Sequence, residues 1–199
     1  DLTDNILKCR RFSGTSKEIA EKGIYYINGL QENGIIATAK HYPGKTLYNK
    51  DPHHYVTYAT IDENDTLPFI FAINNGVKAI MVSWIIVNGT LDSEGKPAAC
   101  SERIIKSLRE KFDGLIITDD ASMLGVREFY KGNLEKMYID LFKAGNDIII
   151  NLKADVNEII YIIDTIERAV KRGEISENSI DESVIRILKT KGINVVKWF

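Results

Sequence analysis

The sequence Gly114-Leu115-Ile116-Ile117-Thr118-Asp119-Asp120 carries a short apolar run directly into two adjacent aspartates. Short, continuous apolar runs are typical of strands that are buried on both faces, as the strands of parallel sheets are. Comparable runs occur at residues 34–39, 79–84 and 147–151. The sequence therefore predicts a buried parallel sheet to which each of these runs contributes one strand.

Segments with helical periodicity lie before, between and after these runs. We predict helices over residues 15–32, 67–75, 101–111, 134–144, 156–172 and 180–190. Ser16 is a candidate N-cap for the first helix, and Pro68 lies near the first turn of the second. Because strands and helices alternate, with strands beginning about 30 to 45 residues apart, a parallel α/β fold is favoured. The periodicity leaves open whether the sheet is open and doubly wound or part of a barrel.

The composition is that of an ordinary globular protein. Of its 199 residues, 44% are hydrophobic and 27% are charged, which excludes a disordered chain, a collagen and a coiled coil. The formal net charge of −2 lacks the basic excess of a nucleic-acid-binding protein. No apolar run reaches the roughly 18 residues of a membrane span. Cys9 and Cys100 are too few for a disulfide scaffold, and their spacing suits no metal site.

Polar residues follow the predicted strands, where parallel α/β folds gather their functional groups. Lys40-His41-Tyr42-Pro43-Gly44 and a polar loop follow the first run, and Asp119-Asp120 end the third. The histidines His41, His53 and His54 all lie in or beside that one loop. We therefore expect an active site at the carboxyl ends of the strands.

Other interpretations of these residues remain open from the pattern alone. The pair Asp119-Asp120 is equally compatible with a helix N-cap, and His53-His54 with a solvent-exposed loop. A metal site from His41, His53, His54 and Asp119 is conceivable, although no compact ligand spacing supports it. The chain has neither a GxGxxG motif nor a Walker loop, so no motif predicts nucleotide binding.

Spaced motifs lie in order along nearly the whole chain. They are Ala39-Lys40-His41-Tyr42-Pro43-Gly44, Asp51-Pro52-His53, Pro97-Ala98-Ala99-Cys100-Ser101 with Leu108-Arg109, Gly114–Met123, Ala144-Gly145-Asn146-Asp147, and residues 180–188 with Arg186. In this order and spacing they resemble the KHFPG, Asp-Ser-His, PA-x-x-S…LR, nucleophile and closing motifs of family 3 glycoside hydrolases. The resemblance is narrowest to the bacterial β-N-acetylglucosaminidase branch of that family.

The resemblance implies a (β/α)₈ barrel of the TIM type. It places the KHFPG strand fifth of the eight, so residues 1–199 would form a single C-terminal half of the catalytic barrel, with about strands 5 to 8 and their helices. The chain begins at Asp1 rather than Met, and we expect a processed or shortened product. The half would expose two sheet edges, which invite association. We expect a complementary N-terminal half or self-association; the alternative is a monomer with an open, flattened sheet.

The resemblance also implies retaining hydrolysis of terminal β-linked N-acetylglucosamine. By position, Asp119 would be the nucleophile, since a carboxylate suits attack on an oxocarbenium-like centre. His53 would be the general acid/base, because an imidazole exchanges its proton near neutral pH. Asp51 would hold the tautomer of His53. Asp120 is expected to help cap or orient the loop.

Carbohydrate would be bound by Lys40, His41 and Arg10, again by position in the family's motifs. No metal or organic cofactor is implied, because two side chains and water suffice for this chemistry. The expected partners are a peptidoglycan-type or chitooligosaccharide substrate, with no nucleic acid and no membrane span. The compartment stays open between cytoplasmic and exported.

Four positions depart from the family pattern. Lys45-Thr46 stand where the family has His-Gly, and Trp84 stands where it commonly has histidine. Pro52 replaces a serine and restricts the backbone of Asp51, which makes His54 a conceivable substitute acid. These departures keep two other hypotheses open: a non-catalytic half-barrel remnant or subunit, and a retaining β-glycosidase of different sugar specificity.

Overall fold

The computed structural model describes residues 11–44, 50–153 and 155–195, and it alternates helices with strands along the chain. The elements are α1 Ser16–Gln31, β1 Thr38–Tyr42, β2 Tyr58–Ile61, α2 Glu63–Asn74, β3 Ala79–Val82, β4 Ile86–Gly89, the 3₁₀ turn η1 Ala98–Cys100, α3 Glu102–Arg109, β5 Leu115–Asp120, α4 Leu124–Phe129, α5 Leu134–Ala144, β6 Ile148–Ile150, α6 Val156–Lys171 and α7 Glu177–Thr190. None of the helices in these ranges is long and apolar enough to cross a membrane.

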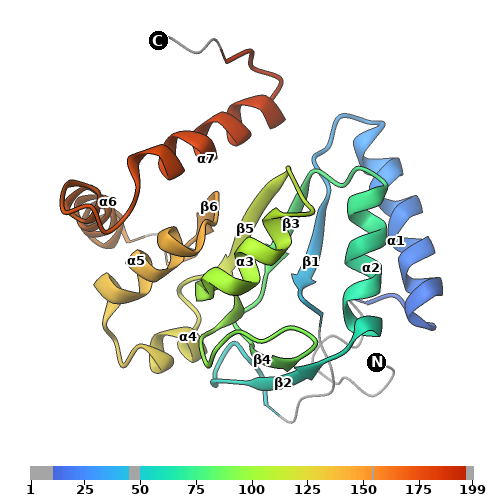
Figure 1. Cartoon of the computed structure of the whole chain (residues 1–199), viewed down its shortest axis with the longest axis horizontal. Helices are drawn as coiled ribbons and strands as arrows, with labels where there is room; N and C mark the ends of the chain where they lie inside the picture. The colour runs from blue at the N-terminus through green and yellow to red at the C-terminus, as the bar shows by residue number, and fades with distance from the viewer. Residues whose placement is uncertain (1–10, 45–49, 154, 196–199) are drawn as a thin grey trace.

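The main sheet has four strands in the order β1-β3-β5-β6, and every neighbouring pair is parallel. Ala39 is level with Ile80, which is level with Ile116. The parallel strands with helices between them confirm the alternating pattern. Neighbours in the sheet also follow one another in the chain, an order that the pattern left open and that part of a barrel has. Figure 1 shows α1 and α2 together beyond β1, and α6 and α7 beyond β6 at the other side of the sheet.

The core lies between this sheet and the helices that cover it. Ile80 and Ile116 from the sheet and Met137 and Leu141 from α5 are completely buried. They belong to one apolar cluster that also includes side chains of α2 and α3. Burying a side chain of this size contributes about 2 kcal/mol, so the cluster holds the strands in fixed register.

The first strand lies four residues later than predicted. Residues 34–37 form the return from α1, because Gly34 has a positive φ of 78° and the Ile35 amide bonds the carbonyl of Leu30. Pairing begins only at Thr38, which is level with Ala79. Lys40 and His41 therefore lie within β1 rather than after it.

Three helix starts also differ from the prediction. Thr15, not Ser16, caps α1 through a capping box with Glu18. Asp62 caps α2, which begins at Glu63, four residues before the predicted start, so Pro68 lies inside the helix. The final helix begins at Glu177 rather than at residue 180.

A second, two-stranded parallel sheet of β2 and β4 was not predicted. Residues 79–87 read as one apolar stretch, so the sequence conceals the break between β3 and β4. The Ile86 amide bonds the Thr57 carbonyl, and the Ser83 amide bonds the Tyr42 carbonyl. The short segment from Ser83 to Ile86 therefore connects the small sheet to the end of the main sheet at which β1 and β3 finish.

Candidate active site

Asp119 lies near the carboxyl end of β5 and carries a partly exposed carboxylate. Its Oδ1 accepts a hydrogen bond of 2.9 Å from the Asp120 amide. Its Oδ2 lies 3.7 Å from Nε2 of His41 on β1. The structure therefore brings together two side chains that lie 78 positions apart in the sequence (119 − 41).

His41 reaches this position at an irregularity in β1. Lys40 is level with Met81 and Tyr42 with Val82, so His41 is an extra residue between two paired positions. An extra residue of this kind turns a side chain in a new direction, and such bulges are common beside active sites. The His41 imidazole is mostly buried, with 16% of its side chain exposed. Lys40, the other predicted sugar-binding residue on this strand, is exposed.

Asp51 and His53 form a hydrogen-bonded pair in the loop that follows β1. Nδ1 of His53 lies 2.6 Å from Oδ1 of Asp51, which also accepts the His53 amide at 2.9 Å. Burial raises the pKa of Asp51, but the bonds from His53 outweigh it and hold this pKa below its ordinary value. Pro52 between them therefore leaves the pair in contact. The His54 ring instead lies edge-on against Tyr55.

The loop that carries His53 is fastened to the segment that follows β5. The Leu124 amide donates to the His53 carbonyl at 3.0 Å. A Cβ at Gly125 would lie 2.6 Å from the Pro52 carbonyl oxygen, so only glycine permits this approach. Gly125 was not predicted from the sequence, although it lies two residues past the aspartate motif that ends at Met123.

Asp120 does not cap a helix, so that interpretation of the aspartate pair is wrong. The helix after β5 begins at Leu124, and its N-cap position is Met123. The Asp120 carboxylate accepts the Ser122 amide and hydroxyl and the Leu152 amide. Burial raises the pKa of Asp120, and these hydrogen bonds reverse that effect and lower the pKa.

Trp84 lies just after β3 and is buried, with 4% of the residue exposed. Its indole Nε1 donates to the Asp120 carbonyl at 3.0 Å. The position at which the family commonly has a histidine therefore holds a ring that contacts the backbone next to Asp119.

Two sequence-based interpretations remain: the roles of Arg10 and Lys45, and the conceivable metal site. Arg10 and Lys45 lie outside the described residues. Within the described ranges, no group of three or more histidine, cysteine, aspartate or glutamate side chains is placed to hold a metal ion.

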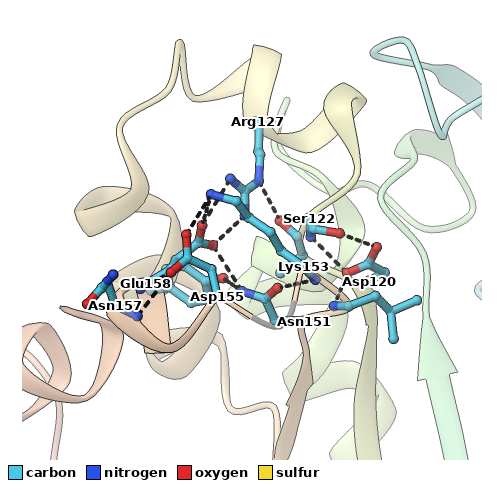
Figure 2. Close-up of polar contacts among 11 residues, drawn as sticks. Asp120, Ser122, Arg127, Asn151, Lys153, Asp155, Asn157 and Glu158 are labelled. Carbon is cyan, nitrogen blue, oxygen red and sulfur yellow. Dashed lines mark hydrogen bonds and ion pairs between the residues drawn. The ribbon is translucent and has the colours of Figure 1, made fainter. Parts of the chain in front are cut away.

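Glu158 on α6 is the centre of a polar network that was not predicted from the sequence (Figure 2). Its carboxylate binds Nη2 of Arg127 at 2.5 Å, Nζ of Lys153 at 2.9 Å and Nδ2 of Asn151 at 2.9 Å. Burial raises the pKa of Glu158, and the bonds from Arg127, Lys153 and Asn151 outweigh it, to a pKa of about 2. The network fixes the loop after β6 to the segment after β5.

We expect Glu158→Gln to lower stability above about pH 4.5 and to have less effect in strong acid. The folded-state pKa of about 2 lies below the ordinary 4.5, so the carboxylate stabilises the fold above pH 4.5 and loses this contribution as pH falls towards 2. The difference between the two pKa values corresponds to about 3 kcal/mol of folding free energy. Denaturant unfolding at a series of pH values measures it. A variant whose stability differs from the parent by the same amount at pH 3 and pH 7 would contradict the assignment.

Comparisons with known proteins identify the family of the chain. Residues 2–190 match the family described as Glycosyl hydrolase family 3 N terminal domain. The chain is 27% identical over 203 residues to the beta-hexosaminidase LpqI of Mycobacterium tuberculosis, covering 96% of this chain and 51% of LpqI. It is 26% identical over 202 residues to a beta-N-acetylglucosaminidase/beta-glucosidase of Cellulomonas fimi, covering 94% of this chain and 35% of that protein.

The solved structures show the same fold. A glycoside hydrolase family 3 beta-N-acetylglucosaminidase from Paenibacillus sp. str. FPU-7 superposes with a TM-score of 0.85 at 27% identity, covering 98% of this chain and 39% of that one. The chain spans about half the length of LpqI. Its α/β fold is of the TIM-barrel type found in these relatives. The chain therefore belongs to glycoside hydrolase family 3, and residues 2–190 correspond to the N-terminal domain of that family.

Proposed function

We propose that the protein is a retaining glycoside hydrolase that releases terminal β-linked N-acetylglucosamine from peptidoglycan-type or chitooligosaccharide substrates. The observation that carries the proposal is the Asp51–His53 pair, with 2.6 Å between carboxylate and imidazole, on a loop bonded to the segment after Asp119. The names of the relatives, beta-hexosaminidase and beta-N-acetylglucosaminidase, support the sugar.

In the first step, protonated His53 donates its Nε2 proton to the glycosidic oxygen as the bond to the leaving group breaks. Asp119 attacks the anomeric carbon and forms a glycosyl ester with inverted configuration. Asp51 accepts a hydrogen bond from Nδ1–H of His53. This bond fixes the orientation of the ring and stabilises the imidazolium. Lys40, His41 and Arg10 would bind the sugar hydroxyls.

In the second step, neutral His53 takes a proton from water, and the resulting oxygen attacks the anomeric carbon. The ester bond to Asp119 breaks, its carboxylate leaves, and a second inversion restores the β configuration. His53 ends the cycle protonated again. This exchange of roles suits an imidazole, whose two protonation states are both populated near neutral pH.

We further propose that residues 1–199 work as the C-terminal half of a barrel together with a complementary N-terminal half. In the described part of the chain, β1 and β6 are the outer strands of the sheet. Large apolar side chains are also exposed on two helices: Tyr25 and Tyr26 on α1 are 80% and 62% exposed, and Ile160 and Ile163 on α6 are 52% and 60% exposed. Open strand edges invite pairing with another chain.

Both proposals are tested by the release of 4-nitrophenol from its β-N-acetylglucosaminide. The chain is assayed alone and mixed with a chain that carries strands one to four of a family 3 barrel, with the molar mass followed by light scattering. We expect the mixture to form one complex of the summed mass and to have the higher turnover. Turnover in neither sample would refute the enzyme and favour a non-catalytic remnant.

The same assay separates the remaining alternatives. A monomer of about 22.5 kDa with full turnover alone would refute the complementary half, and an active homo-oligomer would replace it with self-association. Trp84 gives a specific reason to include an aryl β-glucoside, because it stands where a family histidine is common. Faster release from the glucoside would assign a different sugar.

A further inference from the structure

Asp120 is bonded to the segments that follow both neighbouring strands. β5 lies between β3 and β6 in the sheet. From the β3 side, Nε1 of Trp84 donates to the Asp120 carbonyl at 3.0 Å. From the β6 side, the Leu152 amide donates to Oδ1 of Asp120 at 2.9 Å. One residue therefore fixes the end of β5 against the ends of both adjacent strands.

This attachment reaches the Asp119 carboxylate through the backbone. The Asp120 amide is the group that donates to Oδ1 of Asp119, at 2.9 Å. With Oδ1 engaged in this way, Oδ2 is the oxygen that faces His41, 3.7 Å away. The Asp120 amide thus engages one oxygen of Asp119, and the other oxygen faces His41.

The donor on the β6 side is itself held in place. Asn151 and Lys153, on either side of Leu152, both bond the Glu158 carboxylate, at 2.9 Å each. Glu158 in turn pairs with Arg127, whose Nε donates to the Ala121 carbonyl at 3.2 Å. Figure 2 shows this network on one side of Asp120. The Leu152 amide therefore lies between two residues that are both bonded to Glu158.

We infer that Asp120 is a positioning residue, which holds Asp119 so that Oδ2 is the oxygen that attacks the anomeric carbon. The inference rests on the proposed function for its kinetic consequence. Attack requires the reacting atoms to be aligned at contact distance, and a misplacement of about 1 Å costs about a hundredfold in rate. Binding of the sugar depends on other groups and is affected less.

The first test compares Asp120→Ala and Asp120→Asn in the preparation that turns over. We expect Asp120→Ala to lower kcat about 10- to 100-fold with KM changed less than about threefold. Asp120→Asn should recover most of kcat, because its amide oxygen still accepts from Leu152. Asp62→Ala is the matched control, since that carboxylate accepts two backbone amides within the first turn of α2. Equal losses in the asparagine and alanine variants would refute positioning.

The second test does not depend on turnover. The amide resonance of residue 120 should shift as Asp119 titrates, because that amide is bonded to its carboxylate. Asp120 also carries a carboxylate that affects its own amide, so the measurement is made in variants that lack it. We expect the shift in Asp120→Asn, and its loss in Asp120→Ala and in the double variant Asp119→Asn/Asp120→Asn. A titration shift that persists in Asp120→Ala would overturn the inference. An Asp120→Asn variant that shows the shift, together with a parent that does not turn over, would refute the proposed function and leave the positioning of Asp119 supported.

Discussion

Asp119→Asn is expected to lower kcat for the aryl β-N-acetylglucosaminide by about a thousandfold or more, the usual scale for the loss of a nucleophile. The amide has nearly the shape of the carboxylate, and its oxygen can still accept from the Asp120 amide. It carries no charge, however, and cannot form the glycosyl ester. The stability of the protein should change little, because the carboxylate is only partly buried.

Asp113→Asn is the matched control for this variant. Asp113 is exposed and precedes β5, at the opposite end of the same strand. Initial rates at saturating substrate, together with the thermal midpoint of each variant, give the comparison. Unchanged turnover in Asp119→Asn would remove Asp119 from the mechanism, whereas equal losses in both variants would indicate a general effect of charge.

Asp147→Ala is expected to destabilise the fold by about 3 to 5 kcal/mol, as the loss of one partner from a buried ion pair does. The Asp147 side chain is completely buried, and it binds Arg109 at 2.6 Å, Arg186 at 2.8 Å and the Ile116 amide at 2.8 Å. Alanine leaves two guanidinium groups and a buried amide without this acceptor. Denaturant unfolding of parent and variant measures the difference.

The matched control for Asp147→Ala is Glu167→Ala. Glu167 pairs with Lys171 on the surface of α6, where both side chains are more than half exposed. Exposed pairs of this kind contribute between about 0 and 1 kcal/mol. A loss of stability in Asp147→Ala no larger than in Glu167→Ala would show that the buried cluster does not hold α7 to the sheet.

The cluster around Asp147 also explains why three sequence motifs accompany one another. Arg109 ends the PA-x-x-S…LR signature, Asp147 ends the Ala-Gly-Asn-Asp segment, and Arg186 lies in the closing helix. In the fold they form one ion cluster, away from Asp119, that joins α3, β5, the β6 approach and α7. Part of the resemblance to the family therefore comes from residues that hold the fold together and not from residues of the active site.

The alternation of apolar runs and helical segments was sufficient for the parallel sheet, whereas the order of its strands followed only from the family resemblance. Each run is short, continuous and flanked by periodic helices, so the local pattern and the fold agree. It was not sufficient for the exact start of β1, because Ile35 and Ile36 are as apolar as a buried strand yet lie exposed in the return from α1. Their exposure depends on the turn at Gly34.

Contacts of the candidate site could be predicted where both residues lie in one motif, and could not be predicted where the two residues lie in distant segments. Asp51 and His53 are two residues apart, so their pairing follows from local geometry. The contacts of Trp84 and Leu152 with Asp120 span 36 and 32 positions. Only the sheet order, which places β5 between β3 and β6, brings those donors together.

The central claim, a covalent glycosyl-enzyme on Asp119, is tested most directly by trapping it. The active preparation is incubated with a fluorinated N-acetylglucosaminyl fluoride, quenched and digested, and the labelled peptide is found by mass spectrometry. We predict one fluorosugar adduct per active site, on Asp119 and absent from Asp119→Asn. An adduct on another carboxylate would contradict this account, as would turnover that converts the β-glycoside into the α product.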